Sequence, residues 1–168
     1  SYYLEQEKTK TQLALASVKK ESEEEKALRL HMIDLTEEDE INALNGNYEN
    51  LEAVRAKYQQ QRIDEEERYA SARIKKIQEN AALESIYRTG AFEQEMQELD
   101  LLRAKGLISE EEYNKRSLDL TSAYSVEQAK TSLDLINQML DVENLSDDEA
   151  LKLKQQKASA EIELAEAV

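Results

Sequence analysis

His31 is the only histidine of the chain and therefore the first residue to consider for metal binding or proton transfer. A di-iron or zinc site in a helical bundle needs carboxylates and histidines at helical spacing, such as Glu-x-x-His on facing helices. Position 28 is a leucine, and the chain has no second histidine. We therefore expect His31 to be a partly exposed helical residue whose one special role would be local pH sensitivity.

Three runs of glutamate, at 23–25, 65–67 and 110–112, are the other groups that could hold a cation or act as acid and base. Calcium loops place oxygen ligands on a bent loop around a central glycine, and no such loop occurs. Consecutive helical residues point about 100° apart, so a run does not converge on one ion. A glycine-rich phosphate loop and a nucleophile elbow are also missing. We expect no catalytic residue, no metal site, no cofactor and no enzymatic activity.

The composition predicts a helical protein without a thick core. Of 168 residues, 37 are acidic and 22 are basic, and the resulting net charge of -15 argues against direct binding to phosphate backbones. Proline is absent and glycine occurs only three times, as in a chain built almost wholly of helix. There is no cysteine for a disulfide, and no apolar stretch approaches the roughly 20 residues of a membrane span. Apolar residues at helical spacing favour helix over disorder.

The stretch AKGLISEEEY at 104–113 marks the clearest helix boundary. Gly106 suits the left-handed residue that ends a helix, and Ser109 with Glu112 has the spacing of a capping box. The same signals recur at 142–150, where Asn144 replaces the glycine and Ser146 with Glu149 forms the box. One helix should end and another should begin at each place, as in a helical hairpin.

A third version of the cap signal lies at 35–40, and two weaker boundaries are expected, at Asn45-Gly46 and near Gly90. Thr36 should be the N-cap of a short helix, and Asn45-Gly46 is a strong turn signal. Gly90 either ends a helix or is an interior glycine. Together the signals predict a first helix at 1–35, a short capped helix and turn at 36–46, a long helix at 47–105 with a break near 89–91 if Gly90 ends it, and helices at 109–143 and 146–168. We expect the last helix to continue in a longer parent protein.

Apolar residues between these boundaries recur every three or four positions, which is typical of narrow stripes that bury against one or two partner helices. The phase shifts at Leu83 and Ile86, and again at Phe92, as at coiled-coil stutters. The predicted fold is all-α, with elongated helical hairpins or coiled coil made of long amphipathic helices. The stripe that we expect to mediate association comprises Ile63, Ala70, Ile74, Ile77, Leu133, Ile136 and Leu140.

Long, proline-free helices rich in Glu, Lys, Gln and Ala, interrupted by GLISEEEYNKR, resemble the coiled-coil segments of bacteriophage and prophage tail tape measure proteins. The motif covers 106–116, with echoes at LTEEDE and NLSDDEA. The resemblance implies that copies of an elongated helical protein fill the tail tube, help set its length and leave during DNA ejection. The expected hairpin turns depart from this pattern, since a simple ruler would have fewer of them.

We therefore expect a structural, non-catalytic helical assembly protein, tape-measure-like, that spans or fills a phage tail tube in the virion. It would form a homo-oligomer, as a trimer or hexamer, beside other tail or scaffold proteins. A cytoplasmic coiled-coil adaptor or scaffold that binds partner helices is the alternative. A four-helix-bundle metal carrier or enzyme is the third hypothesis, and the single histidine opposes it. No membrane segment is expected in this chain.

Overall fold

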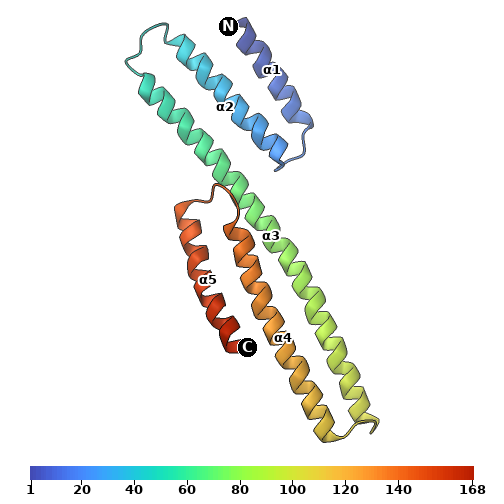
Figure 1. Ribbon diagram of the computed structural model, residues 1–168. Helices are drawn as coiled ribbons and strands as arrows, with labels where there is room; N and C mark the ends of the chain where they lie inside the picture. Colours follow the sequence, from blue (N-terminus) through green and yellow to red (C-terminus); the bar gives the residue numbers. More distant parts are fainter. The chain divides into compact units, whose positions relative to one another are not determined.

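A computed structural model describes residues 1–168 and contains only α-helices, so the predicted all-α class of long helices and hairpins is confirmed. The helices are α1 (Tyr2–Ser17), α2 (Glu23–Ala43), α3 (Leu51–Ala104), α4 (Glu110–Leu140) and α5 (Asp147–Ala167) (Figure 1). They form two compact units, Ser1–Arg73 and Ile74–Val168, and the 54-residue helix α3 contributes to both.

The first unit packs α1, α2 and the beginning of α3 side by side (Figure 1). Glu40 near the end of α2 pairs with Lys57 of α3, with Nζ–Oε2 at 2.7 Å, and Glu37 pairs with Arg62. As the paired residue on α3 moves toward the C-terminus, its partner on α2 moves toward the N-terminus. The two helices are therefore antiparallel. The buried side chains are Leu4, Thr11, Glu25, Leu35, Val54, Tyr58, Tyr69 and Ala70.

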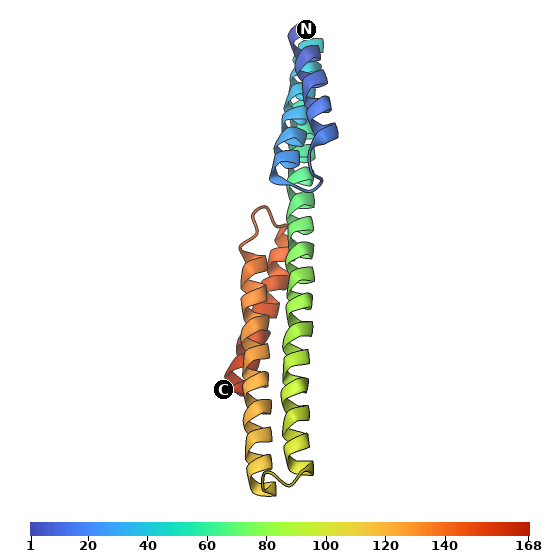
Figure 2. The same cartoon turned by 90° about the vertical axis from the view of Figure 1, so that its right-hand side faces the viewer.

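The second unit folds α4 back along α3 and α5 back along α4, as two views of the ribbon show (Figures 1 and 2). Its core lies where all three helices meet and comprises Ile74, Ile136, Met139, Leu153 and Ala160. Ile77, Leu133, Leu135, Leu140, Val142 and Leu145 pack against this cluster.

Farther along α3 and α4, polar and aromatic contacts hold the two helices together. The rings of Phe92 and Tyr124 stack with centroids 4.3 Å apart, and the Tyr124 hydroxyl lies 2.8 Å from the Thr89 hydroxyl. Near the turn, the Tyr113 hydroxyl donates to Asp100 at 2.6 Å, and the Arg103 guanidinium lies over the Tyr113 ring. The register of the hairpin is therefore fixed by specific contacts as well as by apolar burial.

The turn between α3 and α4 has the expected chemistry. Gly106 adopts a φ of +70°, its N–H donates to the Arg103 carbonyl, and the Leu107 N–H donates to the Leu102 carbonyl at 2.9 Å. These two bonds are a Schellman motif, which satisfies carbonyls at the end of α3. Ser109 is the N-cap of α4 and accepts a hydrogen bond from the Glu112 backbone N–H. The capping box is only half formed, because the Glu112 carboxylate accepts instead from Arg116 at 2.8 Å.

The turn between α4 and α5 uses the corresponding residues. Asn144 takes a left-handed backbone with a φ of +64°, and Ser146 caps α5 by accepting from the Glu149 backbone N–H at 3.2 Å. Asn45 and Gly46 also have positive φ, at +50° and +85°, in the turn that leads into α3.

The first 46 residues differ from the expectation. The range 1–35 is not one helix, because the chain leaves α1 after Ser17 and begins α2 at Glu23. Ser22 is the N-cap of α2, and the expectation that Thr36 is an N-cap was wrong. Thr36 lies inside α2, where its hydroxyl donates to the Met32 carbonyl at 2.8 Å, four residues back along the same helix.

Gly90 does not break α3, which continues from Leu51 to Ala104 without a turn. The phase shift at Leu83 and Ile86 is likewise no stutter. Phe92 is half-buried and Leu99 is buried, on the face of α3 that already carries Ile74, whereas Leu83 and Ile86 are exposed on other faces. Apolar residues on two different faces of one continuous helix follow each other in this part of the sequence, and they look like a phase shift of a single stripe.

Candidate binding surfaces

The residues that could carry chemistry are dispersed. The His31 imidazole is about half exposed and lies 3.9 Å from one carboxylate, that of Glu7. No group of three or more His, Asp or Glu side chains could hold a metal ion. Two of the glutamate runs, 23–25 and 110–112, lie in the first turns of α2 and α4, where they favour the positive end of each helix dipole.

The exception among the acidic residues is Glu25, which is only 8% exposed. The Tyr69 hydroxyl of α3 donates a hydrogen bond to its carboxylate, and the Glu21 backbone N–H donates a second at 3.3 Å. The bond from Tyr69 lowers the pKa of Glu25, against the desolvation that would raise it. Burial, together with that bond, raises the pKa of Tyr69 to about 12. The pair ties α2 to α3 with the carboxylate ionised and the phenol protonated.

The stripe that the sequence assigns to association lies inside the two units. Ala70 is buried in the first unit and Ile63 is half-buried. Ile74 and Ile136 belong to the core of the second unit, and Ile77, Leu133 and Leu140 pack against it. These residues are buried or half-buried within the single chain, so they offer little free surface to a second protein.

The second half of α3 presents such a surface on the side away from α4. Leu83, Ile86 and Tyr87 are 56%, 67% and 77% exposed, and Leu101 is exposed farther along the helix. Residues three and four apart on a helix are neighbours, so the first three side chains form one apolar patch. Single exposed apolar residues are ordinary on a protein surface, but three adjacent large ones make this patch the candidate surface for a partner. The sequence signal for this patch was the apparent phase shift at Leu83 and Ile86.

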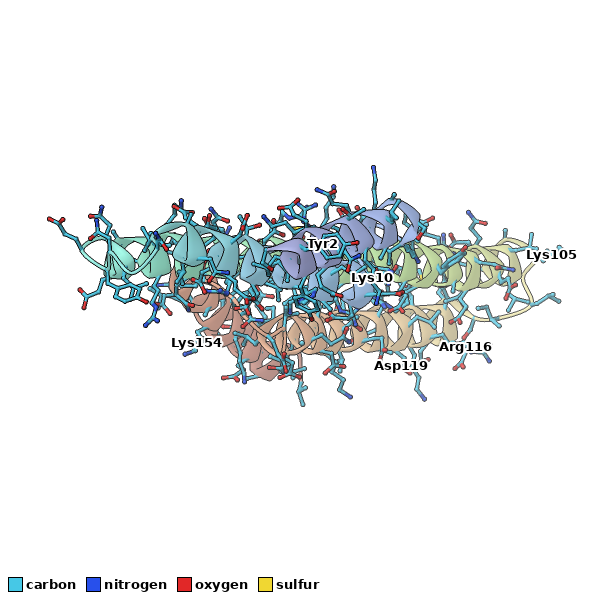
Figure 3. All side chains as sticks on the ribbon, turned by 90° about the horizontal axis from the view of Figure 1, so that it is seen from above. Tyr2, Lys10, Lys105, Arg116, Asp119 and Lys154 are labelled. Carbon is cyan, nitrogen blue, oxygen red and sulfur yellow. The ribbon has the colours of Figure 1, made fainter.

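Charged side chains cover much of the remaining surface (Figure 3). Lys105 lies at the end of α3, Arg116 and Asp119 lie on α4, and Lys154 lies on α5. No helix of the structure is both long enough and apolar enough to cross a membrane.

Comparison with known proteins found no matching family model, no matching curated protein and no matching solved structure.

Proposed function

We propose that this chain is a structural, non-catalytic helical protein that assembles with other helical proteins through exposed faces of its own helices. The observation that carries the proposal is the patch of Leu83, Ile86 and Tyr87, which remains exposed after the helix has packed its other face against α4. A helix that is apolar on a second face has a place for a second partner.

The specific form suggested by the resemblance is a tape-measure-like component of a phage tail. Copies of the chain, as a trimer or hexamer, would line up with other tail proteins and fill the tail tube. The long uninterrupted helix α3 supports this form, because a helix of 54 residues extends roughly 80 Å at about 1.5 Å per residue.

An adaptor or scaffold that binds partner helices is the second form, and the capped turns favour it. The turns at Gly106 and Asn144 fold α4 and α5 back within one chain, so most of the predicted association stripe is already packed inside that chain. Such a protein would act as a monomer that presents a folded helical surface.

Light scattering of the purified chain behind a sizing column tests the proposal. A mass that is three or six times the 19.3 kDa of one chain supports the tail form, and a mass of 19.3 kDa supports the adaptor form. Metal analysis of the same sample addresses the remaining class of function. A stoichiometric bound transition metal would favour the metal carrier or enzyme over the proposed role.

A further inference from the structure

A second heptad pattern runs along the exposed side of α3. Residues at alternating steps of three and four are Asn80, Leu83, Tyr87, Gly90, Gln94, Gln97 and Leu101, and we call them the outer seam. All seven are exposed, and none carries a charge, although 35% of the chain is charged. An uncharged stripe with this spacing, sustained over three heptads, is what one helix offers to another in a coiled coil. The apolar members cluster at Leu83 and Tyr87, with Ile86 beside them.

Gly90 lies in the middle of the outer seam, and the chain itself gives no reason for a glycine there. The residue is helical, and a Cβ added to it would meet nothing within 4 Å. A helix with an interior glycine is less stable than the same helix with alanine, so a glycine that has no role within the chain needs another explanation. On a seam, the missing side chain lets the backbone of a second helix approach closely.

The residues that flank the outer seam determine which helix would fit it. The flanking positions hold five acids and one base: Glu79, Glu84, Glu93, Glu98, Asp100 and Lys105. Within the second unit Glu79, Glu84, Glu93 and Glu98 form no ion pair. Flanking charges of this kind select the partner of a coiled coil by pairing with opposite charges on it. We propose that the outer seam binds an α-helix of another protein that carries an apolar stripe flanked by Lys and Arg.

A second copy of the same helix is a poor occupant. In a parallel pair, Glu79 would face Glu84 and Glu93 would face Glu98, each twice, and like charges at these positions oppose association. An antiparallel pair would again bring mostly acids together, because five of the six charged flanks are acidic. The same acids repel anionic lipid surfaces and nucleic acids, whose charges are also negative.

This inference rests on the proposed function and adds the chemistry of the partner. The test uses the full chain and two synthetic helical peptides of about four heptads. Both peptides carry the same leucine and isoleucine stripe, and they differ only in having Lys or Glu at every flanking position. Fluorescence anisotropy of the labelled peptides measures binding. We expect the Lys-flanked peptide to bind at least about tenfold more tightly than the Glu-flanked peptide.

Charge-reversal variants separate the seam from general attraction between a basic peptide and an acidic protein. Glu93→Lys with Glu98→Lys should remove the preference for the Lys-flanked peptide, because the six flanking positions then carry three acids and three bases. Glu127→Lys with Asp134→Lys changes the net charge equally at exposed positions of α4 and serves as the control. The control should keep the original preference.

Apolar variants test the seam itself. Leu83→Ser with Tyr87→Ser should weaken binding of the Lys-flanked peptide by about tenfold or more without changing the helical content, because both side chains are exposed. Leu118→Ser with Leu151→Ser removes two exposed leucines from α4 and α5 and should leave binding unchanged.

Two results would overturn the inference. One is a failure of discrimination, seen either as equal binding of the two peptides or as an equal loss in the test and control variants. The other is a homodimer of the chain that disappears in the Leu83→Ser, Tyr87→Ser variant, since it would assign the outer seam to a second copy. An oligomer that persists in that variant, with no peptide discrimination, would overturn this inference and leave the proposed function standing.

Discussion

The Tyr69 hydroxyl on α3 donates a hydrogen bond to the Glu25 carboxylate on α2, and both side chains are buried. A hydrogen bond to a charged acceptor stabilises a fold by about 1.5–3 kcal/mol, and its loss leaves the buried acceptor short of a donor. We expect Tyr69→Phe to lower the free energy of unfolding by about 2 kcal/mol, as measured by urea denaturation. Tyr87→Phe, on an exposed tyrosine, is the matched control. Equal stability of the two variants would contradict a structural role for the pair.

The same pair of residues predicts that the stability of the first unit falls at alkaline pH. The pKa of Tyr69 is raised from 10.0 to about 12, so the folded state favours the protonated phenol. Its contribution is complete below the unfolded pKa near 10 and is lost as the pH rises through about 12. We expect the tyrosinate absorbance of the folded wild type, minus that of Tyr69→Phe, to rise with a midpoint near 12. A midpoint near 10 would mean that the phenol is solvated.

On the acid side the first unit should lose stability. The pKa of Glu25, of Asp39 beside Lys8, and of Glu40 beside Lys57 is lowered in each case by a hydrogen bond to the partner. A lowered pKa contributes stability above the unfolded value, and that contribution disappears as the pH falls through the folded value. We expect the melting temperature to fall as the pH drops below the ordinary carboxyl range, and to fall less in Tyr69→Phe, which lacks one of these bonds.

Helix ends were readable from the sequence where local chemistry alone decides them. The positive φ at Gly106 and at Asn144, and the caps at Ser109 and Ser146, depend on residues within one turn of each other. Ser22 caps α2 with the same bond, because its hydroxyl accepts from the Glu25 backbone N–H, and here the Glu25 carboxylate also accepts from the Glu21 backbone N–H. The signal Ser-x-x-Glu was present, but no glycine or asparagine preceded it, and Glu21 itself takes the left-handed backbone with a φ of +62°.

Tertiary packing decided what the sequence pattern could not. The spacing of Ile63 to Leu140 predicted a stripe for association, but spacing does not distinguish a partner helix of the same chain from one of another protein. The positions of Leu83 and Ile86 predicted a phase shift in one apolar stripe. Residues of two faces of a helix can be told apart only when the helices that pack against each face are known. The face that remains free for binding is therefore visible only in the folded chain.

Ser22 and Thr36 provide a direct comparison of the two assignments for α2. The Ser22 hydroxyl accepts a hydrogen bond from the Glu25 backbone N–H at 3.0 Å, so Ser22→Ala should destabilise the first unit by about 1 kcal/mol. Thr36 lies in the helix interior, where alanine is the better helix former, so Thr36→Ala should be neutral or slightly stabilising. Urea unfolding of both variants measures the difference. A larger loss in Thr36→Ala would restore an N-cap at residue 36.

The turn between α3 and α4 should depend on Gly106 and Ser109 together. An alanine at 106 would meet no atom but would be held at a φ of +70°, and an alanine at 109 would remove the cap of α4. We expect each variant to cost about 1 kcal/mol and the double variant about 2 kcal/mol, in equilibrium unfolding. Ser125→Ala, at an exposed interior position of α4, is the control and should be close to neutral. An unchanged double variant would contradict a capped turn.

Gly90 should behave in the opposite way to Gly106, although both are glycines of the second unit. Gly90 has a helical backbone and open space where a Cβ would lie, so Gly90→Ala should raise the free energy of unfolding by about 1 kcal/mol. Gly106→Ala should lower it, because its backbone is left-handed. Urea denaturation of the pair measures the two signs. A stabilised Gly90→Ala variant would show that the isolated chain gains nothing from this glycine. Such a result would support a role for Gly90 in binding by α3, and a destabilised variant would place the reason for the glycine inside the chain.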